Sequence, residues 1–284
     1  MNGRIFVLMS VVAYCAFAQT NVPPAFANEK YGSHERQRMS VWLPNRDTAV
    51  KGRTPALIVI HGGGWKRGDR MKAAGEWFNG CRKRRIALVA ISYRLIGDAN
   101  NQGVKPPVKA CLDDVVEAIQ YVVVHAKTWN IDSTRIGLAG GSAGACSALY
   151  SALLNGNAFG ICAVYAASPQ TTLDPKEMKE WIPNSNYGAH AFGHDNFDDW
   201  LSHRSDCLEW IERFSPAALL RKCPAEKAPK FFYSCVELPP KGELPKDPTH
   251  AAMFCIKFEA LCKEKGVPCK VCGQGEFLDF LLRR

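Results

Sequence analysis

The sequence predicts an α/β domain with a mostly parallel central sheet flanked by helices. Continuous apolar runs of strand length, typical of parallel strands buried on both faces, are the first indication, and they lie at 55–60, 86–94, 135–139 and 161–167. Segments with helical spacing of apolar residues lie between runs, which is the second indication. Alternating strands and helices form parallel sheets, whose ligand sites lie at the carboxyl ends of the strands.

The other elements can be placed in chain order. The further expected strands are an edge strand at 38–44 and two late strands at 229–235 and 267–272. The expected helices include 108–123, 146–154, 251–262 and 277–282. The stretch from 171 to 216 is rich in aromatic residues and histidines and is longer than an ordinary connection. It therefore predicts a partly helical, lid-like insertion over the site.

Composition is consistent with one domain over residues 28–284. The chain has 284 residues, of which 47% are hydrophobic, and this is enough to build a sizeable core. The net charge of +9 is spread along the chain. Its densest basic run, Arg82–Arg85, lies between an expected helix and a strand, and we interpret it as a solvated connection. Because no aromatic stacking platform accompanies it, we expect no nucleic-acid partner.

Residues 1–27 have the features of a signal peptide. Arg4 provides the positive charge, and the apolar stretch 5–18 is too short to span a bilayer comfortably. Small residues spaced for cleavage predict processing after Ala18 or after Ala27. We therefore expect a secreted or periplasmic protein without stable membrane insertion after cleavage; an uncleaved anchor is the alternative.

Cysteines and histidines give no metal prediction. Twelve cysteines in an exported chain suggest disulfides, but their pairing does not follow from the sequence. Cys269 and Cys272 have C-x-x-C spacing without a second pair at zinc spacing. His190, His194 and Asp195 are metal-ligand types, but no expected helix holds their spacing. We expect neither a metal nor a cofactor.

The turn Gly140-x-Ser142-x-Gly144 is the strongest chemical motif. A buried strand precedes it and an apolar helix follows it. A strand that reverses into a helix within a few residues strains the middle residue and exposes its side chain at the top of the sheet. The helix N-terminus behind it favours developing negative charge. The motif therefore predicts that Ser142 is a nucleophile, with a structural turn as the alternative.

The glycine-rich segment His61–Trp65 follows another buried strand. Glycines at the carboxyl end of a central strand leave backbone N–H groups unobstructed, which is what stabilising an oxyanion requires. The segment predicts an oxyanion hole, and a flexible glycine loop is the alternative. Trp65, at its end, is a candidate substrate-binding residue.

Three motifs together carry a family resemblance: His61-Gly-Gly-Gly-Trp65, Ser92-Tyr-Arg-Leu95 and Gly140-Gly-Ser142-Ala-Gly144. The chain resembles the α/β-hydrolase fold, and within it the hormone-sensitive-lipase-like and carbohydrate (acetylxylan or feruloyl) esterases. The resemblance covers most of the chain after residue 27. It implies a serine esterase that hydrolyses carboxylic esters, with acyl groups on carbohydrate among the expected substrates; the N-terminal segment predicts that this esterase is secreted.

The resemblance also implies roles for individual residues. Ser142 would be the nucleophile, and the N–H groups of Gly63, Gly64 and Ala143 would bind the oxyanion. The triad acid is expected after the penultimate strand, where Asp247 precedes a proline as the N-cap of the helix that follows.

The triad histidine is where the sequence departs from the family pattern. The loop after the last strand reads Gly273-Gln-Gly-Glu-Phe277, and no histidine follows His250. His250, expected on the first turn of the helix after Asp247, and His190 and His194 in the insertion are the candidate bases. Without a base, Ser142 is a weak nucleophile. A catalytically impaired or non-catalytic binding member of the fold is therefore the alternative function, and a peptidase is a weaker third.

Overall fold

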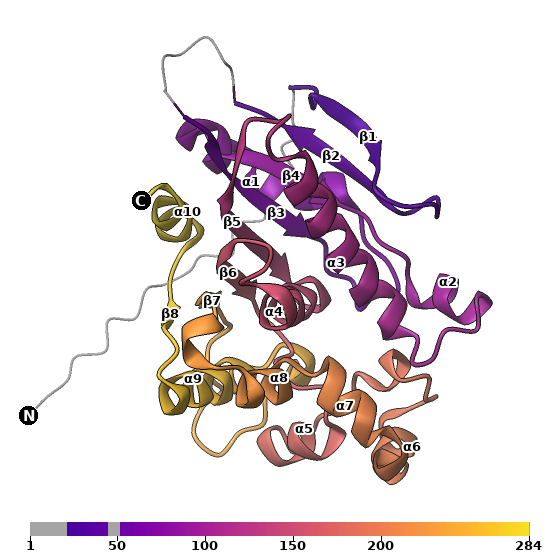
Figure 1. The fold of residues 1–284 in the computed structure, drawn as a ribbon. Helices are drawn as coiled ribbons and strands as arrows, with labels where there is room; N and C mark the ends of the chain where they lie inside the picture. Colours follow the sequence, from indigo (N-terminus) through magenta and orange to yellow (C-terminus); the bar gives the residue numbers. More distant parts are fainter. Residues whose placement is uncertain (1–21, 45–51, 284) are drawn as a thin grey trace, which may run out of the picture.

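The computed structural model describes residues 22–44 and 52–283. One eight-stranded sheet runs through them in the order β1-β2-β4-β3-β5-β6-β7-β8 (Figure 1). The strands are β1 Phe26–Lys30, β2 Arg38–Trp42, β3 Thr54–Ile60, β4 Ala87–Ile91, β5 Ile131–Gly141, β6 Ile161–Ala167, β7 Lys230–Ser234 and β8 Cys269–Val271. β2 pairs antiparallel with both β1 and β4, and the strands from β4 to β8 pair in parallel. The predicted mostly parallel α/β sheet is confirmed.

The side chains of β3 alternate between two cores on opposite faces of the sheet. Leu57 and Val59 join the core built by α1 Arg70–Arg84 and α10 Gln274–Leu282. Ile58 and Ile60 join the larger core on the other face. The helices of that second core are α3 Val108–His125, α4 Ala143–Asn155 and α9 Met253–Lys265. Both faces are therefore buried, which explains the unbroken apolar runs of the central strands.

The segment between β6 and β7 forms the insertion, and its helices gather at one end of the sheet (Figure 1). Its helices are α5 Pro175–Trp181, α6 Phe197–Ser202, α7 Leu208–Phe214 and α8 Pro216–Lys222, and its short 3-10 turns are η1 Ala189–Ala191, η2 Arg204–Cys207 and η3 Ala225–Lys227. Trp200 and Phe214 are almost fully buried within it. The aromatic residues thus pack the insertion onto the domain, and the expectation of a partly helical insertion is confirmed.

Three details differ from the sequence-based expectation. The edge strand β1 was not predicted, and Phe26 and Ala27, assigned above to the signal peptide, lie in it. Most of that peptide, residues 1–21, falls outside the described residues. The basic run is not a connection, because Arg82–Arg84 form the last turn of α1. Cations are favourable there, since the negative end of the helix dipole lies at the helix C-terminus. The last strand covers only Cys269–Val271.

The short helix α2 Ile96–Asn101 follows β4 and completes the elements before α3. Among the helices of the described residues, none combines the length and apolar character needed to cross a bilayer.

Candidate active site

Ser142 occupies a strained turn between β5 and α4. Its φ is 53° and its ψ is −122°, in a region that residues with a side chain rarely adopt. The Ser142 N–H donates to the Ala167 carbonyl at 2.9 Å, which ties the turn to β6. A Cβ on Gly144 would lie 2.2 Å from the Ile60 carbonyl oxygen. Glycine is therefore required at position 144, where the start of α4 packs against the end of β3. Ser142 is the residue of this turn with the strained backbone.

His250, on the segment between β7 and α9, contacts this serine. The His250 Nε2 atom lies 2.9 Å from Ser142 Oγ, and its Nδ1 atom lies 2.7 Å from Asp247 Oδ2. The structure thus brings the predicted nucleophile, the predicted acid and one of the three candidate bases into one hydrogen-bonded series. His190 and His194 make other contacts, described below.

Asp247 and His250 lie on a separate 3-10 turn, η4 Pro248–His250, and not on the first turn of α9 as expected. Ala251, with ψ of 139°, breaks the chain direction before α9 begins. Asp247 caps the short turn by accepting the Thr249 N–H at 3.0 Å through Oδ1. The other carboxylate oxygen is therefore free for His250, and the dipole of α9 does not act along this turn.

The protonation pattern of the pair follows from its hydrogen bonds. Burial alone would raise the pKa of Asp247, but hydrogen bonds and the charge of His250, with the Thr249 N–H, hold that pKa below its usual value. An ionised Asp247 accepts a hydrogen bond from His250 Nδ1–H, and in that tautomer the Nε2 lone pair faces the Ser142 hydroxyl. The side chain of Asp247 is 61% exposed and that of His250 is 33% exposed. The pair therefore lies at the surface of the site.

The glycine segment lies beside the serine turn. In the part of the chain that the structure describes, neither Gly63 nor Gly64 donates its N–H to a protein acceptor. Ala143 is the first residue of α4, so its N–H has no acceptor within the helix. The Gly63 carbonyl accepts the N–H groups of Lys66 and Arg67 at 3.1 and 3.2 Å, which folds the segment into a fixed turn. Three N–H groups are thus available near Ser142 for an anionic oxygen.

A histidine of the insertion hydrogen-bonds to this glycine turn. His190 Nε2 donates to the Gly64 carbonyl at 2.9 Å, and Tyr187 packs edge-on against the His190 ring. Burial, and next the charge of Lys66, lowers the pKa of His190 to about 4. His190 therefore stays neutral and contacts the glycine turn. Because 126 residues separate His190 from Gly64, the sequence alone did not predict this contact.

Two further expectations are corrected or resolved. Trp65 is 1% exposed and donates its indole N–H to Ser147 Oγ at 2.9 Å, so it is a core residue and not a substrate-binding one. His194 lies away from Ser142, with Nδ1 2.8 Å from Asp199 Oδ2 and Nε2 3.4 Å from Cys207 Sγ.

A second histidine, His203, shares the same carboxylate. The donor atoms of His194, Asp199 and His203 lie within 4.8 Å of one another, which is a spacing that one metal ion could bridge. Asp195, grouped with His194 in the sequence, is not a member of this set. The cluster lies in the insertion, and its hydrogen bonds already satisfy the Asp199 carboxylate.

Two polar residues of the insertion that the sequence did not single out hold the turn that carries His250. Gln170, which is 3% exposed, donates through Nε2 to the Thr249 carbonyl at 2.6 Å. Asn184 donates to the Pro245 carbonyl at 2.8 Å. Because both bonds are made to backbone atoms of the 235–247 loop and η4, they position Asp247 and His250 without touching them.

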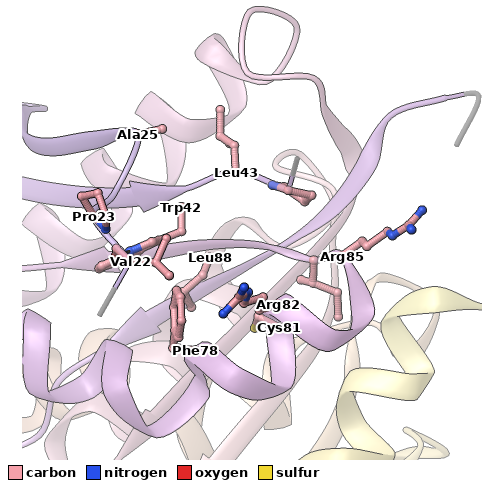
Figure 2. A pocket seen from close by; sticks show the side chains of 12 residues that line it. Val22, Pro23, Ala25, Trp42, Leu43, Phe78, Cys81, Arg82, Arg85 and Leu88 are labelled. Carbon is pink, nitrogen blue, oxygen red and sulfur yellow. Dashed lines mark hydrogen bonds between the residues drawn. The ribbon is translucent and has the colours of Figure 1, made fainter. Parts of the chain in front are cut away.

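A large cavity lies elsewhere in the molecule. It has a volume of about 460 Å³ and is lined by residues that include Trp42, Phe78, Arg82 and Leu88 (Figure 2). Leu88 is near the start of β4, whereas Ser142 follows the end of β5, and the two strands run in the same direction. The cavity is thus at the opposite end of the strands from Ser142.

The parallel sheet, the strained serine turn and the glycine segment define an α/β-hydrolase fold. Residues 39–186, more than half of the chain, match the BD-FAE family model, and the chain belongs to that family. The resemblance to the α/β-hydrolases that the motifs indicated is therefore confirmed.

A curated relative and solved structures agree with this assignment. Over 97 residues the chain is 32% identical to an AB hydrolase superfamily protein of Schizosaccharomyces pombe (strain 972 / ATCC 24843). That match covers 34% of this chain and only 26% of the relative. Two of the similar solved structures are a truncated carbohydrate esterase from gut microbiota (TM-score 0.65, 15% identity, 90% and 94% of the two chains) and a bacterial heroin esterase (TM-score 0.62, 18% identity, 85% and 72%). A third, an acetyl ester-xyloside bifunctional hydrolase from Caldicellulosiruptor lactoaceticus, has a TM-score of 0.60 at 17% identity, with 92% of each chain covered. At these identities the structures establish the shared fold.

Proposed function

We propose that this protein is a serine esterase that hydrolyses carboxylic esters. The observation that carries the proposal is the series Asp247–His250–Ser142, with distances of 2.7 and 2.9 Å. Its parts are a carboxylate, an imidazole and a hydroxyl in the order that activates a serine. The family, and the esterases among the proteins of similar fold, support the same reaction class.

In the acylation step, Ser142 Oγ attacks the ester carbonyl carbon while His250 Nε2 takes the hydroxyl proton. Asp247 stabilises the imidazolium that forms and holds its ring in place. The N–H groups of Gly63, Gly64 and Ala143 then receive the negative oxygen of the tetrahedral intermediate. His250 returns the proton to the leaving alcohol, and an acyl group remains on Ser142.

In the deacylation step, His250 removes a proton from a water molecule, and the resulting hydroxide attacks the acyl carbon. The same N–H groups stabilise the second oxyanion, and Ser142 leaves with the proton from His250. Acyl groups on carbohydrate are proposed substrates, and the similar folds of a carbohydrate esterase and an acetyl ester-xyloside hydrolase support this proposal. We further propose that the protein is secreted or periplasmic, on the strength of the N-terminal segment.

Steady-state hydrolysis of p-nitrophenyl acetate by the wild type and by His250→Ala, His190→Ala and His194→Ala tests this function. We expect His250→Ala to lower kcat by about 10³-fold or more, because the serine loses its base. His194→Ala, whose partner is Asp199, is the matched control and should stay within about twofold of the wild type. An unchanged rate in His250→Ala would exclude it as the base. A wild type without hydrolysis would favour a non-catalytic binding member of the fold.

A further inference from the structure

Two histidines and an aspartate of the insertion converge at a partly exposed position. Asp199 lies in α6, and His203 directly follows that helix at the i,i+4 spacing that places both on one face. His194 lies on the loop before the helix. In the described part of the chain, this is the one group of at least three histidine, cysteine or carboxylate side chains whose ligand atoms all lie within 4.8 Å of one another. The fold thus brings two nitrogen donors to one carboxylate.

The spacing of these atoms is close to that of the ligands of a small tetrahedral cation. Zn²⁺ binds imidazole nitrogen and carboxylate oxygen at about 2.0–2.2 Å, so its ligand atoms lie about 3.3 Å apart. His194 Nδ1 lies 2.8 Å from Asp199 Oδ2, and His203 Nδ1 lies 3.0 Å from Asp199 Oδ1. Each imidazole donates a proton to the carboxylate in this arrangement. A cation that replaces these protons would keep all three side chains together.

The other ring nitrogen of His194 has the partner that a metal ligand requires. A histidine that binds a metal through one nitrogen usually donates a hydrogen bond from the other, which fixes the ring. His194 Nε2 lies 3.4 Å from the sulfur of Cys207, a residue that is 2% exposed. With a metal on Nδ1, the Nε2–H group donates to this buried sulfur. The backbone of the carboxylate residue is also fixed, because Asn196 Oδ1 accepts the Asp199 N–H at 2.9 Å.

We propose that His194, Asp199 and His203 form a zinc-binding site with water as the fourth ligand. Two imidazoles and a carboxylate are donors that suit Zn²⁺, and three protein ligands leave one position open. The side chains of Asp199 and His203 are 34% and 55% exposed, so the ion enters directly from solvent. A metal was not expected from the sequence, because only the fold of the insertion brings these two residues to His194.

The bound ion would link α6 to the loop that precedes it, and so would stabilise the insertion. A metal that binds the folded chain and not the unfolded chain raises the free energy of unfolding. The cluster makes no contact with Ser142, so the zinc site does not rest on the proposed ester hydrolysis.

Equilibrium dialysis of the untagged full chain against Zn²⁺, with the bound metal measured by mass spectrometry, tests the proposal. The wild type should bind one Zn²⁺ per chain. His203→Ala and Asp199→Ala should each lower the affinity by at least about 100-fold, because each removes a ligand, and Cys207→Ala should lower it by about tenfold. Asp198→Ala, in the same turn of α6, is the matched control and should stay within about twofold of the wild type.

The thermal midpoint gives a second readout. Zn²⁺ at about 100 times its Kd should raise the Tm of the wild type and of Asp198→Ala by at least about 5 °C and leave that of His203→Ala unchanged. Because the His203 side chain is more than half exposed, its truncation should leave the fold intact.

A wild type that binds no Zn²⁺ would overturn the proposal. Zn²⁺ binding that survives in both His203→Ala and Asp199→Ala would overturn it as well, because the ion would then lie on other side chains. Failure of ester hydrolysis would leave both outcomes unaffected, since neither measurement uses an ester.

Discussion

At the scale of single residues, the geometry of the site depends on the backbone conformation and the hydrogen bonds of each side chain. Ser142 is strained and fixed by Ala167, whereas His250 is held by Asp247 on a turn of three residues. His190 has neither role, and instead donates to Gly64 from the insertion. The two histidines therefore differ in role, because His250 contacts Ser142 and Asp247 whereas His190 contacts the Gly64 carbonyl.

The lowered pKa of His190 makes a prediction about stability and pH. Its ordinary value is 6.5 and its folded value is about 4, so between these values the unfolded chain binds the extra proton. Stability is then fully present above about pH 6.5 and is lost as pH falls towards about 4, by up to about 3 kcal/mol. His190→Gln, which still donates to Gly64 but does not titrate, should flatten this dependence. Urea unfolding across that range measures it, and equal pH dependence in both proteins would refute the assignment.

At the scale of elements, the turn η4 replaces the histidine loop that the family pattern leads one to expect after the last strand. β8 is short and is followed almost at once by α10, which packs against α1. The proposed base, His250, instead follows the penultimate strand, three residues after the proposed acid, Asp247. The insertion holds this turn and the loop before it through hydrogen bonds to the carbonyls of Thr249 and Pro245.

Gln170→Ala tests this support. We expect kcat to fall by about tenfold with a smaller change in KM, because His250 loses its alignment while the substrate pocket persists. Gln120→Ala, on an exposed position of α3, is the matched control and should be neutral. Ester hydrolysis by the two variants gives the comparison. A change in KM alone for Gln170→Ala would show that this residue contacts substrate rather than the turn.

At the scale of the whole molecule, a buried ion pair joins the first edge of the sheet to the helical layer. Asp114 of α3 is fully buried and accepts from the Arg94 guanidinium, the Arg94 N–H and Gln37. The structure pairs Asp114 with Arg94 and places Asp113 beside Lys109 at the surface.

The two neighbouring aspartates therefore make a matched test of stability. Asp114→Asn should lower the free energy of unfolding by about 3–5 kcal/mol, because the fully buried carboxylate is lost and Arg94, whose side chain is 19% exposed, loses its charge partner. Asp113→Asn should cost less than about 1 kcal/mol, since its pair is partly exposed. Urea denaturation of both variants measures these free energies of unfolding. Equal decreases in the two variants would contradict the argument from burial.

The sheet and the serine turn were predictable because their signals are local. Apolar runs identify β3 to β6, and Gly140-x-Ser142-x-Gly144 identifies the turn within five residues. Asp247 and His250 are only three residues apart in sequence, but their approach to Ser142 depends on how the loop from 235 folds back. β1 was missed because its short apolar stretch at Phe26 also fits a cleavage site, and Trp65 was misread because its burial depends on Ser147.

The central claim is that His250 activates Ser142, and labelling with a fluorophosphonate ester tests it most directly. Intact-mass spectrometry should show one adduct per wild-type chain, mapped to Ser142, and none in Ser142→Ala. His250→Ala should react at least about 10²-fold more slowly, whereas His194→Ala should react at the wild-type rate. A wild type that resists labelling, or equal labelling rates in the wild type and His250→Ala, would contradict the claim.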